Sequence, residues 1–525
     1  MRFFKTLFFV CALAAVYNTA TAQRYLTPQF STVSKSALTP YGFNYTVLPV
    51  LFNPAARTQR QPLVMQVYTP DGDPEVKRPL IIYLHTGNFF PFPQNNSCGG
   101  NLNDSSNVEF ATRLAKMGYV VAVADYRLGW APTATTETTR RFTLINAAYR
   151  GLQDVSTCVR FFRKNVAEGG NTYKIDPDKI VVWGQGTGGY LSLASAYLNK
   201  FEDIYKTSDP NKFVIINPQL PGGKYNMVQE AVNGDIYATT GPTTVDVLLN
   251  VVSGGLFKTG DTLCIPNHVG YASNFQLCVN MGGALGDSTW LDKGDVPLIS
   301  YHVPTDFFAP CETNVLNVPS INGPQPVVEV TGSCGLHKYV EEYGNNDVFK
   351  KILPSADKYG AIAKARSGGA NGFLPLIGTP NNSASPWEWT SLTGNPAPLA
   401  TAGCNNLDGA VARAYIDTII TYFAPRACVA LGLNCVGVSS TTNLLSDSQV
   451  QIVPNPAQSV MTFSADADHL IQSVELFDIS GRAVRSVFNI NQPSFEMQRG
   501  NIVTGMYVAK IRFRDGIVAR RVVFE

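Results

Sequence analysis

The sequence predicts a doubly wound α/β domain with a mostly parallel sheet, followed by a small all-β domain. Between about residues 41 and 425, short apolar runs alternate with stretches of helical periodicity, which is typical of strands covered on both faces by helices. After residue 443 the pattern changes to short alternating segments separated by turn residues, as in an immunoglobulin-like antiparallel sandwich. The apolar runs of the first domain are residues 80–84, 120–124, 180–183, 214–216 and 298–301.

Periodicity and composition predict the helices and loops of the first domain. Apolar residues recur at spacings of three and four over residues 108–117 and 152–166, and Gly118 is expected to close the first of these helices as a left-handed cap. Residues 217–297 and 355–405 are rich in Gly, Pro, Asn and Thr. We expect them to be long excursions over the sheet edge where open α/β sheets bind ligands, or else plain surface loops held partly by disulfides.

The composition of the chain indicates which kinds of binding partner can be expected. Charged residues make up 15% of the chain and the net charge is +2, without a cluster of lysine and arginine, so nucleic acid is not an expected partner. Beyond the first 22 residues no run of about 18 apolar residues occurs, so no transmembrane segment is predicted. The chain has no metal-ligand spacing, P-loop or dinucleotide fingerprint, and we predict neither a cofactor nor a metal site.

The N-terminal 22 residues have the pattern of a secretory signal. Arg2 and Lys5 precede an apolar stretch over residues 7–16, and small residues at 20–22 form a cleavage site. Of the ten cysteines, Cys11 lies inside this segment, and most of the others are expected to pair in an oxidising compartment. Spacing favours the pairs Cys264–Cys278, Cys311–Cys334, Cys428–Cys435 and, at longer range, Cys98–Cys158, with Cys404 left over.

Residues 184–189 have the sequence of a nucleophile elbow that lacks its nucleophile. They follow the apolar run 180–183 and precede a helical pattern over residues 190–197. A G-x-S-x-G elbow needs this strand–turn–helix setting, because the tight turn requires small residues around an exposed central side chain. The central position here is Gly186, which has no side chain. The segment therefore predicts a hydrolase fold and argues against hydrolase chemistry.

Most of residues 40–425 resemble the carboxylesterase- and lipase-like branch of the α/β-hydrolase family. The resemblance runs from the opening strand through the oxyanion loop and the elbow to the acid loop. It implies a doubly wound, mostly parallel sheet and a Ser–His–Asp triad with backbone donors for the oxyanion. The stretches that carry it are residues 65–70, 79–89, 118–128, 176–184 and 302–306.

The resemblance assigns the triad positions one at a time. The nucleophile position falls on Gly186, and the acid position on Asp306, which is either a vestigial acid or a turn carboxylate. The base should follow the acid along the chain. Only His337 and His469 do so, and His337 lies at the start of a predicted helix that precedes the last strand. Residues 372–378, where the base is expected, contain no histidine.

The oxyanion loop of the family is altered as well. His85, Thr86, Gly87 and Asn88 replace an HGG-type sequence, and the β-branched Thr86 restricts the backbone where a close approach is needed. Gly87 and the amide after Gly186 remain a candidate donor pair for a carbonyl or an anion. His85 is interpreted as a loop-packing residue, with a catalytic role as the alternative.

Thr187 is the alternative nucleophile. It stands one residue beyond the centre of the turn, so its hydroxyl is expected to point away from the site, and it can instead bond the turn as a structural group. His337 is the corresponding alternative base. His268 and His302 are predicted to be structural.

Residues 447–525 resemble the type A sorting domain of the type IX secretion system of Bacteroidota. The resemblance implies export to the outer cell surface, with the secretion machinery as partner. It divides the chain into a signal (1–22), an α/β-hydrolase-fold domain (23–435), a linker (436–446) and the sorting domain (447–525). The stretches that carry it are residues 453–456, 476–482, 505–511 and 520–524.

These observations predict a secreted or surface-bound protein of α/β-hydrolase fold that is catalytically inactive and acts as a binding or structural component. Its expected ligand is a small molecule or a surface polymer. Two alternatives remain open. One is a working esterase or lipase that uses Thr187 or His337 in an unconventional arrangement. The other treats Gly186 as a peculiarity of this chain within an active family.

Overall fold

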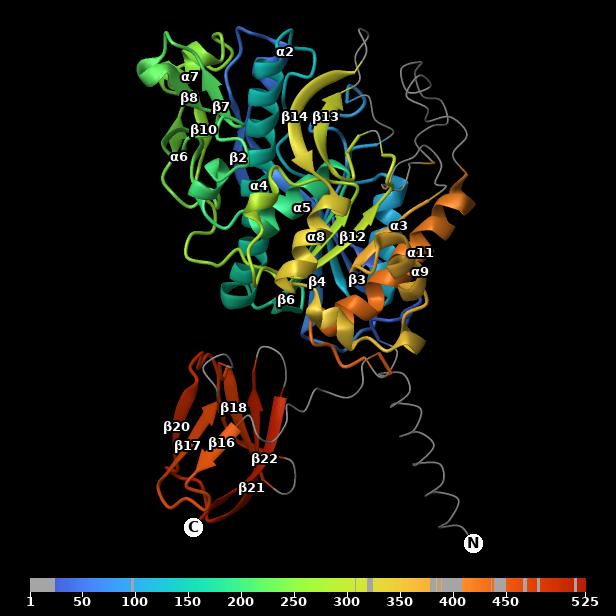
Figure 1. The fold of residues 1–525 in the computed structure, drawn as a ribbon, viewed down its shortest axis with the longest axis vertical. Helices are drawn as coiled ribbons and strands as arrows, with labels where there is room; N and C mark the ends of the chain where they lie inside the picture. The colour runs from blue at the N-terminus through green and yellow to red at the C-terminus, as the bar shows by residue number, and fades with distance from the viewer. Residues whose placement is uncertain are drawn as a thin grey trace. The chain divides into compact units, whose positions relative to one another are not determined.

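The computed structural model describes residues 24–95, 99–306, 308–318, 324–377, 384, 389, 408–435, 437–438, 450–465, 470–478, 482–513 and 517–525. The chain separates into two compact units, residues 1–438 and 439–525 (Figure 1). The predicted signal and all of the predicted linker except residues 437–438 lie outside the described residues. Among the described residues, no helix is long and apolar enough to cross a membrane.

A nine-stranded mixed sheet forms the centre of the first unit. Its strand order is β1-β3-β5-β4-β6-β11-β12-β15, and β2 pairs with β3 outside this path. The pairs from β5 to β15 are parallel, whereas β1, β2 and β5 each pair with β3 in antiparallel fashion. The strands are β1 (Val33–Lys35), β2 (Thr39–Thr46), β3 (Gln59–Pro70), β4 (Arg78–Leu84), β5 (Val120–Ala124), β6 (Ile175–Gln185), β11 (Leu277–Met281), β12 (Leu298–His302) and β15 (Phe373–Pro375).

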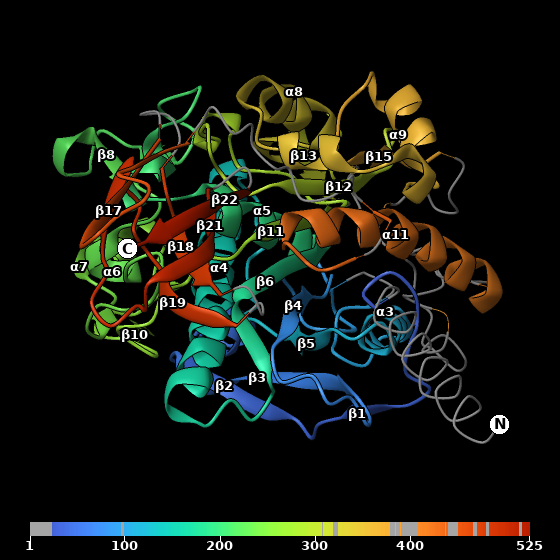
Figure 2. The same cartoon turned by 90° about the horizontal axis from the view of Figure 1, so that it is seen from below.

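Helices cover both faces of this sheet (Figure 2). Alternate strand residues point to opposite faces, so that Ile82 and Val182 join one apolar core and Ile81 and Val181 the other. The first core is covered by α4 (Glu137–Glu168), α5 (Thr187–Tyr197) and α8 (Ser333–Tyr343). The second core is covered by α3 (Ser105–Lys116), α9 (Gly360–Ser367) and α11 (Gly409–Ala430).

The doubly wound fold is confirmed, and the predicted strands at 80–84, 120–124, 180–183 and 298–301 are β4, β5, β6 and β12. Gly118 lies just after the end of α3 and has a positive φ of 106°, as predicted for the residue that closes this helix. The prediction that the run 214–216 is a strand of the central sheet is wrong. The run forms β7 (Val214–Ile216), which pairs with β8 (Lys224–Asn226) in a separate two-stranded sheet.

The interpretation of residues 217–297 as excursions missed a central strand. β11 lies between β6 and β12 and is buried along its whole length. Asn280 interrupts its apolar run, which hid the strand from a search by hydrophobicity. Much of the rest of the segment forms short elements that share an apolar cluster with Val47 and Phe142, including α6 (Glu230–Asn233), β9 (Thr243–Thr244), α7 (Val247–Val252) and β10 (Thr262–Cys264).

Shorter elements complete the first unit. They are α2 (Leu48–Phe52), the hairpin β13 (Thr313–Val318) and β14 (Gln325–Thr331), and the 3-10 turns η1 (Phe201–Tyr205), η2 (Pro221–Gly223), η3 (Ser288–Trp290), η4 (Asp347–Lys351) and η5 (Pro354–Ala356).

Two of the predicted disulfides are confirmed. Cys311 is bonded to Cys334 and Cys428 to Cys435. The predicted pairs Cys264–Cys278 and Cys98–Cys158 are wrong, because Cys264, Cys278 and Cys158 are buried free thiols. Cys278 lies in the central strand β11 under α5, whereas Cys264 lies in β10 beside Asn44, so closeness along the chain does not bring the two sulfurs together. Cys98 and Cys404 lie outside the described residues.

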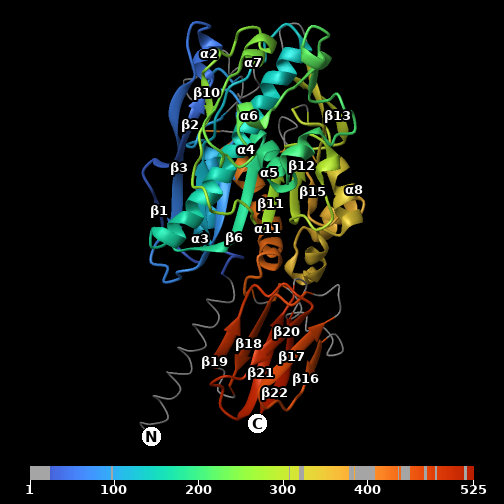
Figure 3. The same cartoon turned by 90° about the vertical axis from the view of Figure 1, so that its left-hand side faces the viewer.

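The C-terminal unit is built from two antiparallel sheets around one apolar core (Figure 3). Alternating residues of its strands point into that core, as their period of two predicts. One sheet contains β16 (Val450–Val453), β17 (Val460–Ala465) and β20 (Ser494–Gln498), and the other β18 (Ser473–Phe477), β19 (Ala483–Val487), β21 (Gly505–Arg512) and β22 (Ile517–Phe524).

Candidate functional site

The turn between β6 and α5 has the backbone geometry of a nucleophile elbow. β6 ends at Gln185 and α5 begins at Thr187, with Gly186 between them at φ 56° and ψ −117°. This is a strained region for any residue with a Cβ, and it is where an elbow holds its nucleophile above the sheet edge. The turn therefore keeps the conformation of an elbow although no side chain projects from its centre.

The glycines that flank the centre are needed for packing. A Cβ on Gly184 would overlap the carbonyl group of Gly188, and a Cβ on Gly188 would overlap the carbonyl oxygen of Leu84 in β4. A Cβ on Gly189 would lie 2.5 Å from Oδ1 of Asn280 in β11. The start of α5 thus approaches two strands so closely that only glycine fits.

A cavity of about 800 Å³ lies beside the elbow. None of the described residues that line it carries a charge, and its amide and small hydroxyl side chains are those of Asn88, Gln94, Asn95, Thr133, Thr187 and Asn317. Burial of a charge without a partner is costly, so this cavity suits an uncharged, largely apolar ligand. Its aromatic lining comes mainly from Phe89, Trp130, Tyr149, Tyr190, Phe213 and Trp290.

The altered oxyanion loop keeps backbone groups near the elbow. Gly87 and Asn88 both have positive φ angles, 134° and 57°. The Asn88 side chain donates to the carbonyl oxygen of Asn95 at 2.9 Å, and the Asn88 carbonyl accepts from Nε1 of Trp130 at 2.7 Å. The amide of Thr187 stands at the start of α5, where a helix has no acceptor of its own for its first N–H groups. The backbone amides of Gly87 and Thr187 are the candidate donors for a carbonyl oxygen.

His85 is buried and held by its neighbours. Its Nε2 lies 3.1 Å from Oδ1 of Asp125, and its ring stacks on Tyr126 with centroids 4.8 Å apart. Burial by itself would lower the pKa of His85, but the hydrogen bond and charge of Asp125 outweigh it, so that the pKa lies above its usual range. These contacts are those of a packing residue.

Thr187 forms a hydroxyl chain with Tyr126. Its Oγ1 lies 3.0 Å from the Tyr126 hydroxyl oxygen, and Tyr126 donates to the backbone carbonyl of His85 at 2.8 Å. Burial raises the pKa of Tyr126 well above its usual range, so its phenol is a poor proton acceptor at neutral pH. Thr187 therefore makes the contact of a structural hydroxyl, although its place at the cavity was not expected from the turn.

Asp306 sits in a turn after β12. Its Oδ1 accepts from the backbone amides of Phe308 at 2.8 Å and Ala309 at 3.3 Å, and its Oδ2 accepts from that of Ala384 at 3.2 Å. Burial raises its pKa to about 6, although these hydrogen bonds act in the opposite direction. Its partners are those of a turn carboxylate.

None of the described histidines hydrogen-bonds to Asp306. The chain has five histidines, of which His469 lies in the C-terminal unit outside the described residues. His85 pairs with Asp125 as described above, and Nε2 of His268 lies 2.6 Å from the carbonyl oxygen of Tyr41.

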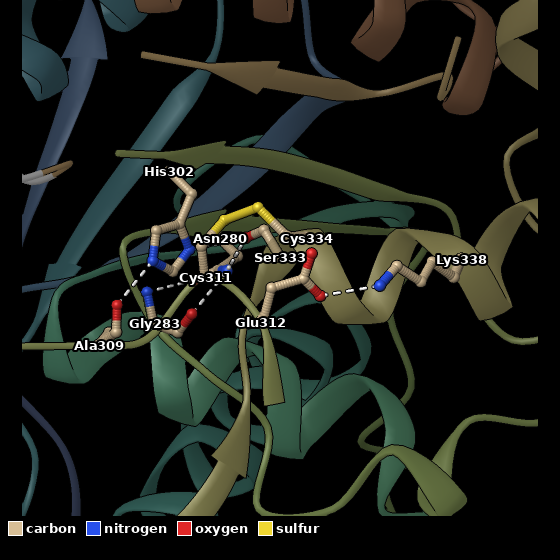
Figure 4. Close-up of a disulfide and its surroundings, with 9 residues drawn as sticks. All are labelled: Asn280, Gly283, His302, Ala309, Cys311, Glu312, Ser333, Cys334 and Lys338. Carbon is tan, nitrogen blue, oxygen red and sulfur yellow. Dashed lines mark hydrogen bonds and ion pairs between the residues drawn. A yellow bond between two sulfur atoms is a disulfide. The ribbon is translucent and has the colours of Figure 1, made fainter. Parts of the chain in front are cut away.

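His302 belongs to a buried polar network beside the Cys311–Cys334 disulfide (Figure 4). Its Nε2 lies 2.9 Å from the carbonyl oxygen of Ala309, and its Nδ1 lies 3.0 Å from Oγ of Ser333. Because a carbonyl oxygen only accepts, Nε2 carries the proton and Nδ1 accepts from Ser333. Burial lowers the pKa of His302 to about 4. The network anchors the turn that carries Asp306.

His337 lies on α8, before the last strand of the sheet. Its ring stacks on Phe373 of β15 with centroids 4.9 Å apart, and neither ring nitrogen has a partner among the described residues. Burial lowers the pKa of His337 to about 3, so the ring stays neutral at pH 7. A general base needs access to the proton that it removes, and this ring lacks it.

Sequence reasoning missed two residues that shape the site, Tyr126 and Tyr190. Tyr126 follows the end of β5, which a strand-end rule would have indicated. Tyr190 stands three residues after Thr187 and so lies on the same face of α5. No group of three or more His, Cys, Asp or Glu side chains able to hold a metal occurs in the part of the chain that the structure describes.

Comparisons with known proteins agree with this geometry. Residues 65–216 match the BD-FAE family model, and residues 451–525 match the secretion system C-terminal sorting domain. A search of curated proteins found no match. Residues 65–216 thus match an α/β-hydrolase-like esterase domain. The whole chain is an esterase-like α/β-hydrolase domain with a type IX sorting tail, and that tail links it to the type IX machinery and indicates secretion to the cell surface.

Several solved esterases are similar at low sequence identity. Esterase 2 of Thermogutta terrifontis, phosphorylated by paraoxon, is 14% identical over 52% of this chain and 72% of its own, with a TM-score of 0.27. A truncated carbohydrate esterase from gut microbiota is 16% identical over 47% and 73%, with a TM-score of 0.27. Esterase B from Lactobacillus rhamnosis is 18% identical over 38% and 50%, with a TM-score of 0.21. At such TM-scores the assignment rests on the family models and the strand order.

Proposed function

We propose that the esterase-like domain is a catalytically inactive binding component of the cell surface. Its cavity would hold an uncharged, largely apolar ligand beside the elbow. The observation that carries the proposal is the position of the histidines: of the four that precede the sorting tail, none hydrogen-bonds to Asp306. Acyl transfer needs a nucleophile and a base aligned with each other, and Gly186 supplies no nucleophile.

The working-esterase alternative has little geometric support. Thr187 faces the hydroxyl of Tyr126 rather than an imidazole or a carboxylate. His337 is buried against Phe373 without a hydrogen-bond partner. Neither residue therefore has the neighbour that nucleophilic catalysis requires.

Restoration of the nucleophile tests whether one lost residue explains the loss of turnover. In the Gly186→Ser variant, the turn already has the conformation that an elbow serine needs. We expect hydrolysis of p-nitrophenyl acetate and butyrate to stay at the level of the parent protein, because the serine would lack a base. A fluorophosphonate probe should leave both the variant and the parent unlabelled.

Efficient hydrolysis by Gly186→Ser would overturn the proposal and support Gly186 as a peculiarity of this chain. Hydrolysis by the parent protein that Thr187→Val abolishes would instead establish the working-esterase alternative. A faint rate decides nothing, since sites stripped of their triad retain about 10³–10⁴-fold acceleration over water.

Binding is tested with N-phenyl-1-naphthylamine, a neutral apolar fluorophore. We expect saturable binding to the parent protein, with quenching of the emission of Trp130 and Trp290 in the cavity wall. Ala148→Phe fills the cavity from α4 and should abolish binding, whereas Ala414→Phe on the exposed face of α11 is the matched control. Equal binding by the two variants contradicts the proposed cavity.

A further inference from the structure

A second pocket of about 570 Å³ lies at the edge of the sheet opposite the elbow. The elbow follows the carboxyl end of β6, whereas this pocket is lined by residues 274–275 and 294–296, just before the amino ends of β11 and β12. The two cavities share only Leu152 and Leu198 among their lining residues. The second pocket is therefore a separate site, on the side of the sheet where α/β folds do not usually bind ligands.

Hydroxyl and amide groups dominate the polar lining of this pocket. Serine, threonine and asparagine side chains come from four separate segments, and two tyrosine rings border it. Asp295 is the single charged residue among the described lining residues. An anionic ligand would thus meet a carboxylate and no cation. The main polar lining residues are Ser156, Ser195, Asn199, Thr239, Ser273 and Asn274.

Two serine hydroxyls in the pocket have no partner among the described residues. Ser156 on α4 is 95% buried, being 5% exposed, and forms no hydrogen bond within the described parts of the chain. Ser195 on the facing helix α5 has a buried Oγ that also lacks a partner. Buried polar groups are normally hydrogen-bonded, so the Ser195 hydroxyl indicates a ligand that completes it, and Ser156 offers a second hydroxyl in the lining of the same pocket.

The other side of the pocket is already rigid. Tyr237 donates its hydroxyl proton to the carbonyl oxygen of Asn199 at 2.9 Å, and the Asn199 side chain donates to Oδ1 of Asp295 at 3.2 Å. Arg160 donates to Oγ of Ser273 at 2.8 Å, which leaves the hydroxyl proton of Ser273 free to donate elsewhere. The groups that would meet a ligand are thus held in place before it binds.

We propose that this pocket binds a neutral saccharide. Sugar hydroxyls donate and accept, as the two unpartnered serines do, while the asparagine amides and the Asp295 carboxylate provide further partners. The ring of Tyr237 is 39% exposed and offers a flat surface to the apolar face of a pyranose. The proposal concerns a different pocket from the cavity at the elbow and does not depend on the absence of catalysis.

The test uses the full secreted chain and two neutral trisaccharides, maltotriose and cellotriose, with spermidine and inorganic phosphate as charged comparisons. Saturation-transfer NMR and isothermal titration should show saturable binding of at least one trisaccharide, with a Kd on the order of 1 mM. We expect weaker or absent binding of spermidine and phosphate. No saturable trisaccharide binding, or tighter binding of either charged compound, overturns the proposal.

Substitutions then locate the site. Ser156→Ala with Ser195→Ala removes two hydrogen bonds to the sugar and should weaken binding by about tenfold or more. Tyr237→Ala should weaken it as well, whereas Tyr339→Ala, which removes a tyrosine that is 38% exposed on α8, is the matched control. Circular dichroism verifies that each variant is folded. The proposal is contradicted if neither the serine double variant nor Tyr237→Ala changes the affinity. It is also contradicted if Tyr339→Ala weakens binding as much as they do, because binding then occurs elsewhere.

Discussion

The elbow and the region expected to supply the base differ in what they keep of the hydrolase geometry. At the elbow the backbone of a hydrolase persists around Gly186, with its strained φ and ψ angles and its closely packed glycines. From the end of β12 to β15 the elements are also present, but the two histidines of this region, His302 and His337, pack in the interior of the protein. His302 anchors a turn, and His337 packs against an aromatic ring.

The difference shows which part of a catalytic site the fold itself requires. The glycines of the elbow let α5 lie against β4 and β11, so their loss would disturb the core whether or not the protein is an enzyme. A catalytic histidine, by contrast, is one side chain on a loop and contributes little to packing. A chain that abandons hydrolysis can therefore lose its base and its nucleophile and still keep its elbow.

The largest effect that would test this comparison is expected from Gly188→Ala. The new Cβ would overlap the backbone carbonyl of Leu84, which cannot move without the strand, so we expect destabilisation by about 3 kcal/mol or more. Gly241→Ala, at an exposed position without a neighbour within 4 Å, is the control and should change stability by less than about 0.5 kcal/mol. Urea unfolding measures both. Equal stabilities would show that the elbow glycines are not packing residues.

The disulfide of the base region should have a comparable effect. Replacement of Cys311 and Cys334 by serine frees a loop with a sequence separation of 23, which should lower the free energy of unfolding by about 3 kcal/mol. The same change at Cys428 and Cys435, with a separation of 7, should cost about 2 kcal/mol. Unfolding of the two double variants provides the comparison, and the reverse order would argue against a role in anchoring the turn of Asp306.

The pH dependence of stability tests whether His337 is closed to protons. Its folded-state pKa of about 3 lies below the ordinary value of 6.5, so the unfolded chain binds the proton first. The stability is fully present above pH 6.5 and is lost as the pH falls toward 3. We expect His337→Leu to avoid about 2 kcal/mol of the loss between pH 7 and about pH 5, leaving the part due to His302.

Urea unfolding at the two pH values measures this difference. If the parent and His337→Leu lose equal stability, the imidazole takes up a proton without penalty. That result would reopen the assignment of His337 as a base.

The smallest effect is expected from Thr187→Val. The variant removes the hydroxyl next to Tyr126, but Tyr126 keeps its hydrogen bond to the carbonyl of His85, so the loss should be about 1 kcal/mol or less. Ester hydrolysis should remain at the level of the parent. Tyr126→Phe, which breaks both bonds, is the comparison and should be the less stable variant in thermal unfolding.

Part of the site could be predicted because it depends on residue type and local pattern. The sequence alone shows that residue 186 has no side chain and that residues 372–378 contain no histidine. Strands β4, β5, β6 and β12 were predicted because they are short and nearly continuous apolar runs. β11 was missed because the polar Asn280 interrupts its apolar run. Asn280 can be buried there because it forms hydrogen bonds with Gly283 and Ser333, and these partners cannot be recognised from the sequence.

The sequence by itself determined the α/β class of the first unit, the strands β4, β5, β6 and β12, the glycine at the centre of the elbow and the identity of the sorting tail, since each is a local pattern. Only the tertiary structure decided which of the predicted cysteine pairs form, that Asp306 is bonded by backbone amides and that His337 lies against Phe373. It also decided that one pocket is lined by uncharged, mostly apolar residues, whereas the other has a larger polar share and one carboxylate. These properties arise where segments far apart in the chain meet. Burial and hydrogen bonding at those contacts, rather than residue type, set the chemistry of each group.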